Sequence, residues 1–185
     1  MAAAGAQDVA QEFTLRLQRA AGLSPRADRL QLKSRLQTLL ESLREDPSIE
    51  GRSNHVEFLL AWWSPREHKP LALHLFSAGA GEWVDRWAFA GVPLGVEIAS
   101  FAVGTMRYLD PAELSLEQAQ VIALKVLRDT IETGVEGIAG AVQIGVLARD
   151  HIRLVTETEM QTLERTVDLW ESCCAELLLA ARDRS

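Results

Sequence analysis

The hydrophobic and polar positions between residues 109 and 147 predict a helix, a glycine-containing loop and a strand in succession. Ser115 and Gln118 have the Ser-x-x-Gln spacing of a capping box, in which each side chain bonds the other residue's backbone amide. Positions suited to one helical face follow at Ala119, Ile122, Ala123, Val126, Leu127, Thr130 and Ile131. Glycines at 134, 137 and 140 allow the helix to end, and AVQIGVLA (141–148) alternates as strands do. We therefore expect a helix over 115–133 and a strand over 141–148.

Two amphipathic helices are predicted before this region, within residues 8–45. Asp8 can cap the first helix, whose apolar face is formed by Val9, Phe13, Leu17 and Ala20. Pro25 starts the second helix, which has a stripe of leucines at positions 32, 36, 39, 40 and 43. The polar segment 46–54, with Pro47 and Gly51, is expected to be a loop.

The remaining pattern indicates strands within 55–91, helices within 94–133, a hairpin over 141–155 and a last helix over 157–182. The strands are expected at 55–63 and 71–76 and, after a turn at Gly79 and Gly81, in a short segment ending at Gly91. Pro93 opens a helix over 94–108, and IRLV (152–155) pairs with 141–148. Paired helices separated by antiparallel strands predict an α+β fold with two helix layers around stacked sheets, because a parallel α/β fold alternates its elements.

The length and charge of the chain restrict the possible functions. A chain of 185 residues fits one domain, and the net charge of −7 argues against nucleic acid as a main ligand. No segment approaches the roughly 20 apolar residues of a membrane helix, and MAAAGAQDVAQEF lacks the basic and apolar regions of a signal peptide. We therefore expect a cytoplasmic protein that contacts neither nucleic acid nor membrane.

Taken together, these segments resemble the 20S proteasome subunits of the N-terminal-nucleophile hydrolase superfamily. DPAELSLEQAQVIALKVLRDTIETG is the closest match, and the resemblance extends from residue 4 to about residue 165. The other matching segments are AGAQDVAQEFTLRLQR, VEFLLAWW, LALHLFSAGAGEW, WAFAGVPLGVEIASFAVGTM and GIAGAVQIGVLARDHIRLVTETEM. The resemblance implies a four-layer αββα sandwich of antiparallel sheets over 1–185, N-terminally truncated, in a family of threonine-type endopeptidases. It also implies a homo- or hetero-oligomer with related subunits.

Departures from that family bear on catalysis. Family members open with strands that carry the catalytic threonine, whereas here the first helix is expected to begin almost at Met1. Lys33 lies between Leu32 and Leu36 on the second helix and does not match the catalytic lysine. Val92 stands where the family has the serine of a Gly-Ser-Gly turn, and 132–140 lacks the family's Asp–Ser pair. A threonine peptidase needs its nucleophile, its own amine and an oxyanion site, so we expect no peptidase activity from this chain.

No residue is assigned a catalytic, cofactor-binding or metal-binding role. The threonines at 14, 105, 130 and 133 are internal and offer no free amine. Among the histidines at 55, 68, 74 and 151, His74 is expected to be a hydrogen-bonded strand residue and His68 to be solvated. A metal or catalytic role for Asp129, Glu132 and Glu136 is open, but an exposed polar loop is favoured. Cys173 and Cys174 are expected to be semi-buried structural thiols.

The tryptophans point towards assembly. Tryptophans 62, 63, 83 and 87 fall in or beside strands, and the adjacent pair must face opposite sides of a strand. One of that pair, and Trp170 on the last helix, could therefore meet a partner. If opening strands are missing, either another chain covers the exposed sheet or the polypeptide is an incomplete product.

Three functions remain open at this stage. The first is a subunit of a self-compartmentalising protease assembly without activity of its own. The second is a non-catalytic scaffold or interaction protein that retains the fold. The third is another amidohydrolase whose nucleophile lies upstream.

Overall fold

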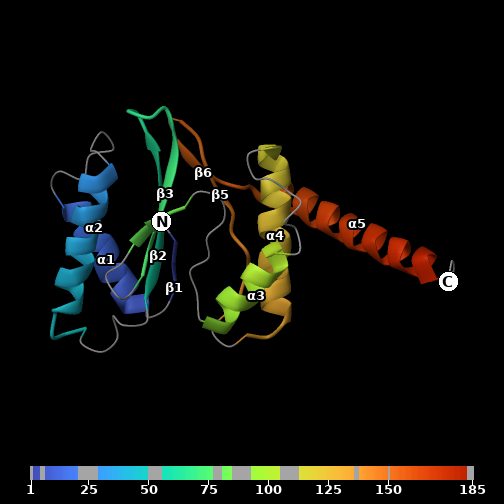
Figure 1. Ribbon diagram of the computed structural model, residues 1–185, viewed down its shortest axis with the longest axis horizontal. Coiled ribbons are helices and arrows are strands. Elements are labelled where there is room, and N and C mark those ends of the chain that lie inside the picture. The colour runs from blue at the N-terminus through green and yellow to red at the C-terminus, as the bar shows by residue number, and fades with distance from the viewer. Residues whose placement is uncertain are drawn as a thin grey trace. The chain divides into compact units, whose positions relative to one another are not determined.

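The computed structural model describes residues 2–4, 7–20, 29–49, 56–76, 81–84, 93–104, 113–135, 138–149 and 151–182. The chain divides into two compact units (Figure 1). The first comprises Met1–Glu97 with Leu147–Ile152, and the second comprises Ile98–Val146 with Arg153–Ser185. That residues 1–185 form a single domain stays a prediction.

The first unit contains an antiparallel sheet with the strand order β1-β2-β3-β4. Its long central pair is β2 (Glu57–Ser64) and β3 (Lys69–Leu75), in which Leu59 lies opposite His74 and Trp62 lies opposite Leu71. β4 (Gly81–Trp83) pairs with β3, so the predicted strand ending at Gly91 is confirmed over its first residues, while residues 85–91 lie outside the described part.

Two helices, α1 (Gln7–Arg19) and α2 (Arg29–Arg44), cover one face of this sheet (Figure 1). The rings of Phe13 on α1 and Phe58 on β2 stack with their centroids 4.1 Å apart, and neither residue is exposed to solvent. Four of the five predicted α2 leucines belong to the buried core around this pair. The buried core consists of Val9, Phe13, Leu32, Leu36, Leu40, Leu43, Ile49, Val56, Phe58, Leu60, Leu73 and Leu75.

A strand precedes the first helix, so the expectation that none lies there is wrong. β1 (Ala2–Ala4) pairs antiparallel with β2, with Ala3 opposite Phe58. Three successive alanines show no alternation of polar and apolar side chains, so the sequence gives no local signal for a strand. Its extended state depends instead on hydrogen bonding to the edge of β2.

The second unit is built around α4 (Leu116–Glu132) and α5 (Glu157–Arg182). The predicted capping box of α4 is confirmed, because Ser115 Oγ accepts from the Gln118 amide at 3.2 Å and Gln118 Oε1 accepts from the Ser115 amide at 2.8 Å. Four buried side chains, Leu124, Ile144, Leu163 and Val167, join the two helices and the start of the hairpin. α3 (Pro93–Gly104) falls at the division between the units, and the last residues of its predicted range, 105–108, lie outside the described part.

The hairpin is shorter than the sequence predicts. Its strands are β5 (Gly145–Leu147) and β6 (Ile152–Leu154), and the predicted strand residues 141–144 are not part of a sheet. A last backbone bond joins the Val155 amide to the Ile144 carbonyl at 2.9 Å. After Val155 the chain enters α5, which begins at Glu157. Residues 141–143 therefore have no strand to pair with in the described part of the chain.

The stacked phenylalanine pair should dominate the stability of the first unit. We expect Phe13→Ala to lower the free energy of unfolding by about 3–5 kcal/mol, because it removes a fully buried ring and leaves a cavity beside Phe58. Leu15→Ala on the same helix is the control, since Leu15 is 42% exposed, and it should change stability by about 0.5 kcal/mol or less. Urea unfolding followed by circular dichroism measures both, and equal losses would contradict this account of the core.

Candidate functional site

The three candidate threonines that lie in the described ranges donate their hydroxyls to backbone carbonyls. Thr14 Oγ1 donates to the Ala10 carbonyl at 2.7 Å, and Thr130 Oγ1 donates to the Val126 carbonyl at 2.7 Å. Thr133 Oγ1 likewise donates to a backbone carbonyl, and Thr105 lies outside the described residues. These hydroxyls satisfy helix carbonyls rather than contact a base.

His74 is a hydrogen-bonded strand residue, as expected. It is 6% exposed, its Nε2 lies 3.1 Å from Glu57 Oε2, and its ring contacts the Phe76 ring with centroids 4.1 Å apart. Its neighbours across the sheet are Leu59 and Glu82, so the described strands place no hydroxyl or thiol beside it. The pair therefore fits a structural role, because a catalytic base needs a nucleophile within hydrogen-bond reach.

Within the described ranges, the other histidines and the tryptophans singled out in the sequence lie at separate places in the fold and do not form a common site. His68 is exposed in the turn between β2 and β3, as expected, and His151 is exposed beside β6, whereas His55 lies outside the described residues. Trp62 packs on the sheet core and meets the Trp83 ring edge-on, with centroids 5.7 Å apart, while Trp63 is half-buried. Trp87 lies outside the described residues.

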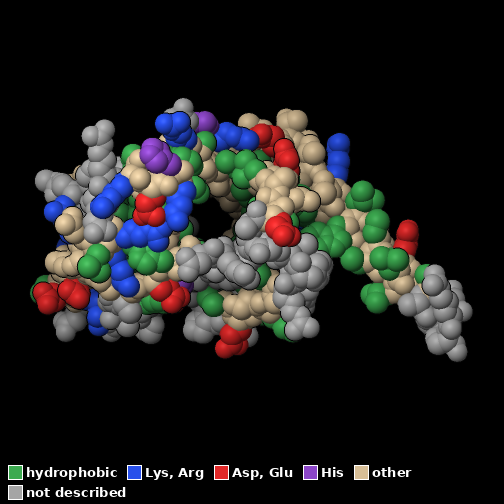
Figure 2. All heavy atoms as spheres, turned by 45° about the horizontal axis from the view of Figure 1, so that its top comes forward, with side chains coloured by type: hydrophobic (Ala, Val, Ile, Leu, Met, Phe, Trp, Pro, Cys, Tyr) green, Lys and Arg blue, Asp and Glu red, His purple; other side chains and the backbone are tan. Residues whose placement is uncertain are grey.

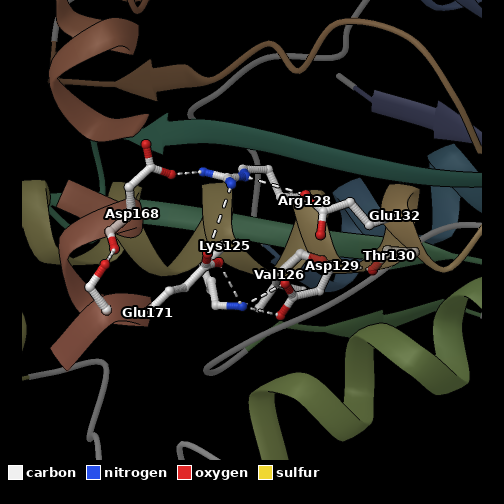
Figure 3. A network of polar contacts seen from close by, with 9 residues as sticks. Lys125, Val126, Arg128, Asp129, Thr130, Glu132, Asp168 and Glu171 are labelled. Atoms are coloured by element: carbon white, nitrogen blue, oxygen red, sulfur yellow. Dashed lines mark hydrogen bonds and ion pairs between the residues drawn. The ribbon is translucent and has the colours of Figure 1, made fainter. Parts of the chain in front are cut away.

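Asp129 and Glu132 lie in α4 and not in a loop, and both form ion pairs (Figure 3), although Glu132 is exposed as expected. Lys125 Nζ lies 2.5 Å from Asp129 Oδ1 and 3.2 Å from Glu171 Oε1 on α5. Arg128 Nη1 lies 2.7 Å from Asp168 Oδ1, also on α5, and its Nε lies 3.8 Å from Glu132 Oε1. Among the described residues no group of three or more potential ligands could hold a metal ion, and Glu136 lies outside them.

This network fixes the charges along the junction between α4 and α5. Burial lowers the pKa of Lys125, but the hydrogen bonds to Asp129 and Glu171 outweigh it, and the net pKa is raised above the ordinary value. The hydrogen bond to Asp168 raises the pKa of Arg128. Both cations therefore stay charged at neutral pH, and the carboxylates have a structural function as their partners.

The start of α5 is held by a second capping box. The Thr156 hydroxyl accepts from the Glu159 amide at 3.3 Å, and Glu159 Oε2 accepts from the Thr156 amide at 2.8 Å. Arg153 Nη1 donates to the same Glu159 oxygen at 2.9 Å. These bonds, the one to the Thr156 amide first, lower the pKa of Glu159 to about 2.

The C-terminal part of α5 leaves the packed junction and exposes hydrophobic side chains. Residues Met160, Leu163, Val167, Trp170, Cys174 and Leu177 follow spacings of three and four, but only the first part of this stripe is covered. Leu163 and Val167 are buried against α4, whereas Leu177 is 71% exposed. We define the apolar end of α5 as residues Cys173–Ala180, which include three consecutive exposed leucines at 177–179 (Figure 2).

Both cysteines belong to this apolar end. Cys173 and Cys174 are exposed, so the expectation of semi-buried thiols is wrong. The apolar stripe continues past Trp170, but α4 does not cover the helix there. The signal that sequence reasoning missed is the Leu-Leu-Leu run itself, which makes this helix apolar around most of its circumference.

Comparison with solved structures assigns the architecture. Anbu (Gly-1 mutant) from Hyphomicrobium sp. strain MC1 superposes with a TM-score of 0.70 and 11% identity, over 97% of this chain and 78% of that one. Anbu (ancestral beta-subunit) from Yersinia bercovieri gives a TM-score of 0.67 and 13% identity, over 96% of this chain and 77% of that one. The chain has a proteasome-like α+β fold. The predicted fold class, with its antiparallel sheets, is therefore confirmed.

The assignment to the 20S proteasome subunit family is wrong. No family model and no curated protein matches the chain. The structures that it resembles are those of Anbu, a proteasome-related but distinct family. The capped helix, glycine turn and hairpin that suggested the 20S family follow from the order of elements in the shared fold, so they cannot separate one family from the other. No helix in the described ranges is long and apolar enough to cross a membrane.

The ion pairs of Lys125 should stabilise the contact between α4 and α5. We expect Lys125→Met to lower the free energy of unfolding by about 1 kcal/mol, because it leaves Asp129 and Glu171 without their shared cation. The loss should shrink at high salt. Lys33→Met is the control, since no ion pair of Lys33 is found among the described residues. Chemical denaturation at low and high salt measures the effect, and a salt-independent loss would contradict an electrostatic origin.

The capping box of α5 should make the free energy of unfolding depend on pH in the acidic range. Because the folded pKa of Glu159 is about 2 and its ordinary value is 4.5, its stabilising effect is complete above about 4.5. The effect should be lost as the pH falls from about 4.5 towards about 2. We expect Glu159→Gln to remove this part of the pH dependence, and Glu176→Gln, further along α5, to retain it. Unfolding free energies measured near neutral pH and near pH 3 test this, and identical slopes for the two variants would contradict it.

Proposed function

We propose that this chain is a subunit of a proteasome-like, self-compartmentalising protease assembly, in which it contributes structure rather than peptide hydrolysis. The observation that carries the proposal is the fold: nearly the whole chain superposes on Anbu, one example of which is described as an ancestral beta-subunit. The proposal includes the cytoplasmic location expected from the sequence.

The apolar end of α5 supports the assembly part of this proposal. An exposed helix that is apolar around most of its circumference is unfavourable in water, so it needs a covering surface. The partner that we propose is a second copy of the chain. The stripe of Leu163 and Val167 already packs against a helix, and the same stripe continues through Cys174 and Leu177 without interruption. Its uncovered part can therefore pack against another helix by the same side-chain spacing.

The environment of the hydroxyl groups supports the absence of peptide hydrolysis. Thr14, Thr130 and Thr133 each donate to a backbone carbonyl, and His74 pairs with Glu57 rather than with a nucleophile. Nucleophilic catalysis requires the hydroxyl to bond a base instead. In the described ranges we therefore assign no residue to catalysis.

Measurement of the assembled mass tests the proposal. We expect the chain to form a multi-subunit species in sedimentation and light scattering, and Leu177→Asp to shift it towards the monomer by placing a charge in the covered surface. Leu30→Asp on α2 is the matched control, because Leu30 is 73% exposed and Leu177 is 71% exposed. Circular dichroism verifies that both variants fold.

Two results would overturn parts of this proposal separately. If the wild-type chain is monomeric at micromolar concentration, the proposal that it forms an assembly is wrong. If the purified chain hydrolyses fluorogenic peptides, the proposal that it contributes no peptide hydrolysis is wrong. Assembly without hydrolysis, together with loss of assembly in Leu177→Asp alone, is the result that we expect.

A further inference from the structure

A hollow of about 400 Å³ lies in the second unit, between residues 142–144, residues 154–157 and the first turns of α5. Its wall combines apolar side chains, such as Val142, Leu154 and Met160, with two carboxylates, Glu157 and Glu164. The lining contains no lysine, arginine or histidine. The lining is thus a mixture of apolar and polar groups, and its charged side chains are both negative.

The two carboxylates stand on one face of α5. Glu157, Met160, Gln161 and Glu164 follow the spacing i, i+3, i+4, i+7, which places the carboxylates about 10 Å apart along the helix with Met160 between them. Neither Glu157 nor Glu164 forms an ion pair with a described residue, whereas Glu159, two positions after Glu157, is paired with Arg153. A cationic group on an aliphatic stem would satisfy both the charge and the apolar wall.

The backbone of residues 141–143, next to the hollow, forms no hydrogen bond within the described part of the chain. Ala141, Val142 and Gln143 make no hydrogen bond to any described residue, because the hairpin ends at the bond between the Val155 amide and the Ile144 carbonyl. The sequence alternates there as in a strand, and the hollow occupies the space beside Val142 and Gln143. The amides and carbonyls of residues 141–143 are therefore available for pairing with another extended chain.

We propose that residues 141–143 bind an extended segment of a different protein, whose lysine or arginine side chain enters the hollow between Glu157 and Glu164. A second copy of this chain is a poorer occupant. The basic residues in its described strands, Lys69 and Arg153, already pair with Glu67 and Glu159. The binding does not depend on the assembly proposed above, so either can fail without the other.

A direct binding measurement tests the charge requirement. A fluorescent, terminally blocked peptide of alternating valine and lysine is titrated with the full chain and followed by anisotropy. We expect saturable binding that the double variant Glu157→Gln/Glu164→Gln weakens about five-fold, with a smaller difference at high salt. Glu41→Gln/Glu45→Gln, at two exposed positions outside the hollow and outside the apolar end of α5, should bind as the wild type does. A valine–glutamate peptide should not bind.

Hydrogen exchange tests the backbone requirement. We expect the peptide to slow amide exchange within residues 141–143, and a valine–lysine peptide N-methylated at alternate residues to bind more weakly, because it lacks the donors for strand pairing. No saturable binding, equal binding of the glutamate peptide, or an undiminished affinity in Glu157→Gln/Glu164→Gln would overturn the proposal. Self-association that this double variant abolishes would also overturn it, since the occupant would then be a second copy.

Discussion

The change from strand to helix at Thr156 is the constraint on which the second unit depends. Thr156 and Glu159 satisfy each other's backbone amides, and Arg153 adds a charged bond to the same carboxylate. Because the chain becomes helical there, β6 cannot continue alongside residues 141–143, and their backbone groups are left open. The same cap fixes the rotation of α5, so that Leu163 and Val167 meet α4 while Glu157 and Glu164 face the hollow.

The contact between α4 and α5 then determines which part of the long helix is covered. Apolar packing at Leu124, Leu163 and Val167 supplies most of the driving force, because buried surface stabilises more than exposed ion pairs do. Lys125 and Arg128 add specificity, since each bonds carboxylates on both helices (Figure 3). The junction ends near Trp170, which is half-buried. Beyond it the helix packs against no other described element of this unit, and its leucines at 177–179 are exposed.

Much of the fold could be predicted from local patterns, and the errors have physical causes. The spacing of apolar side chains and the Ser115–Gln118 pair located α4, and the bounds of α5 agreed with the predicted 157–182. Strand lengths could not be predicted equally well, because a strand needs a partner that may be distant in sequence: Ala2–Ala4 became a strand through β2, and residues 141–144 did not, for lack of a partner. Lys125 and Asp129 are four residues apart, which is the spacing of an ion pair along a helix, so the sequence does contain a signal for this pair. The acidic residues alone do not reveal it, because the signal lies in the position of the lysine.

The family assignment failed for a related reason. Order and spacing of elements are properties of a fold, so the segments quoted from the sequence indicated a proteasome-like fold without deciding the family. Function is decided by side chains at a site instead. Here the hydroxyls of Thr14, Thr130 and Thr133 bond backbone carbonyls, and the histidine in the sheet bonds a carboxylate. Among the described residues, groups without partners include the apolar end of α5, the backbone of residues 141–143 and the carboxylates of Glu157 and Glu164. Groups of these kinds are suited to binding other chains, which is why we propose that the surface of the second unit carries the interactions of this protein.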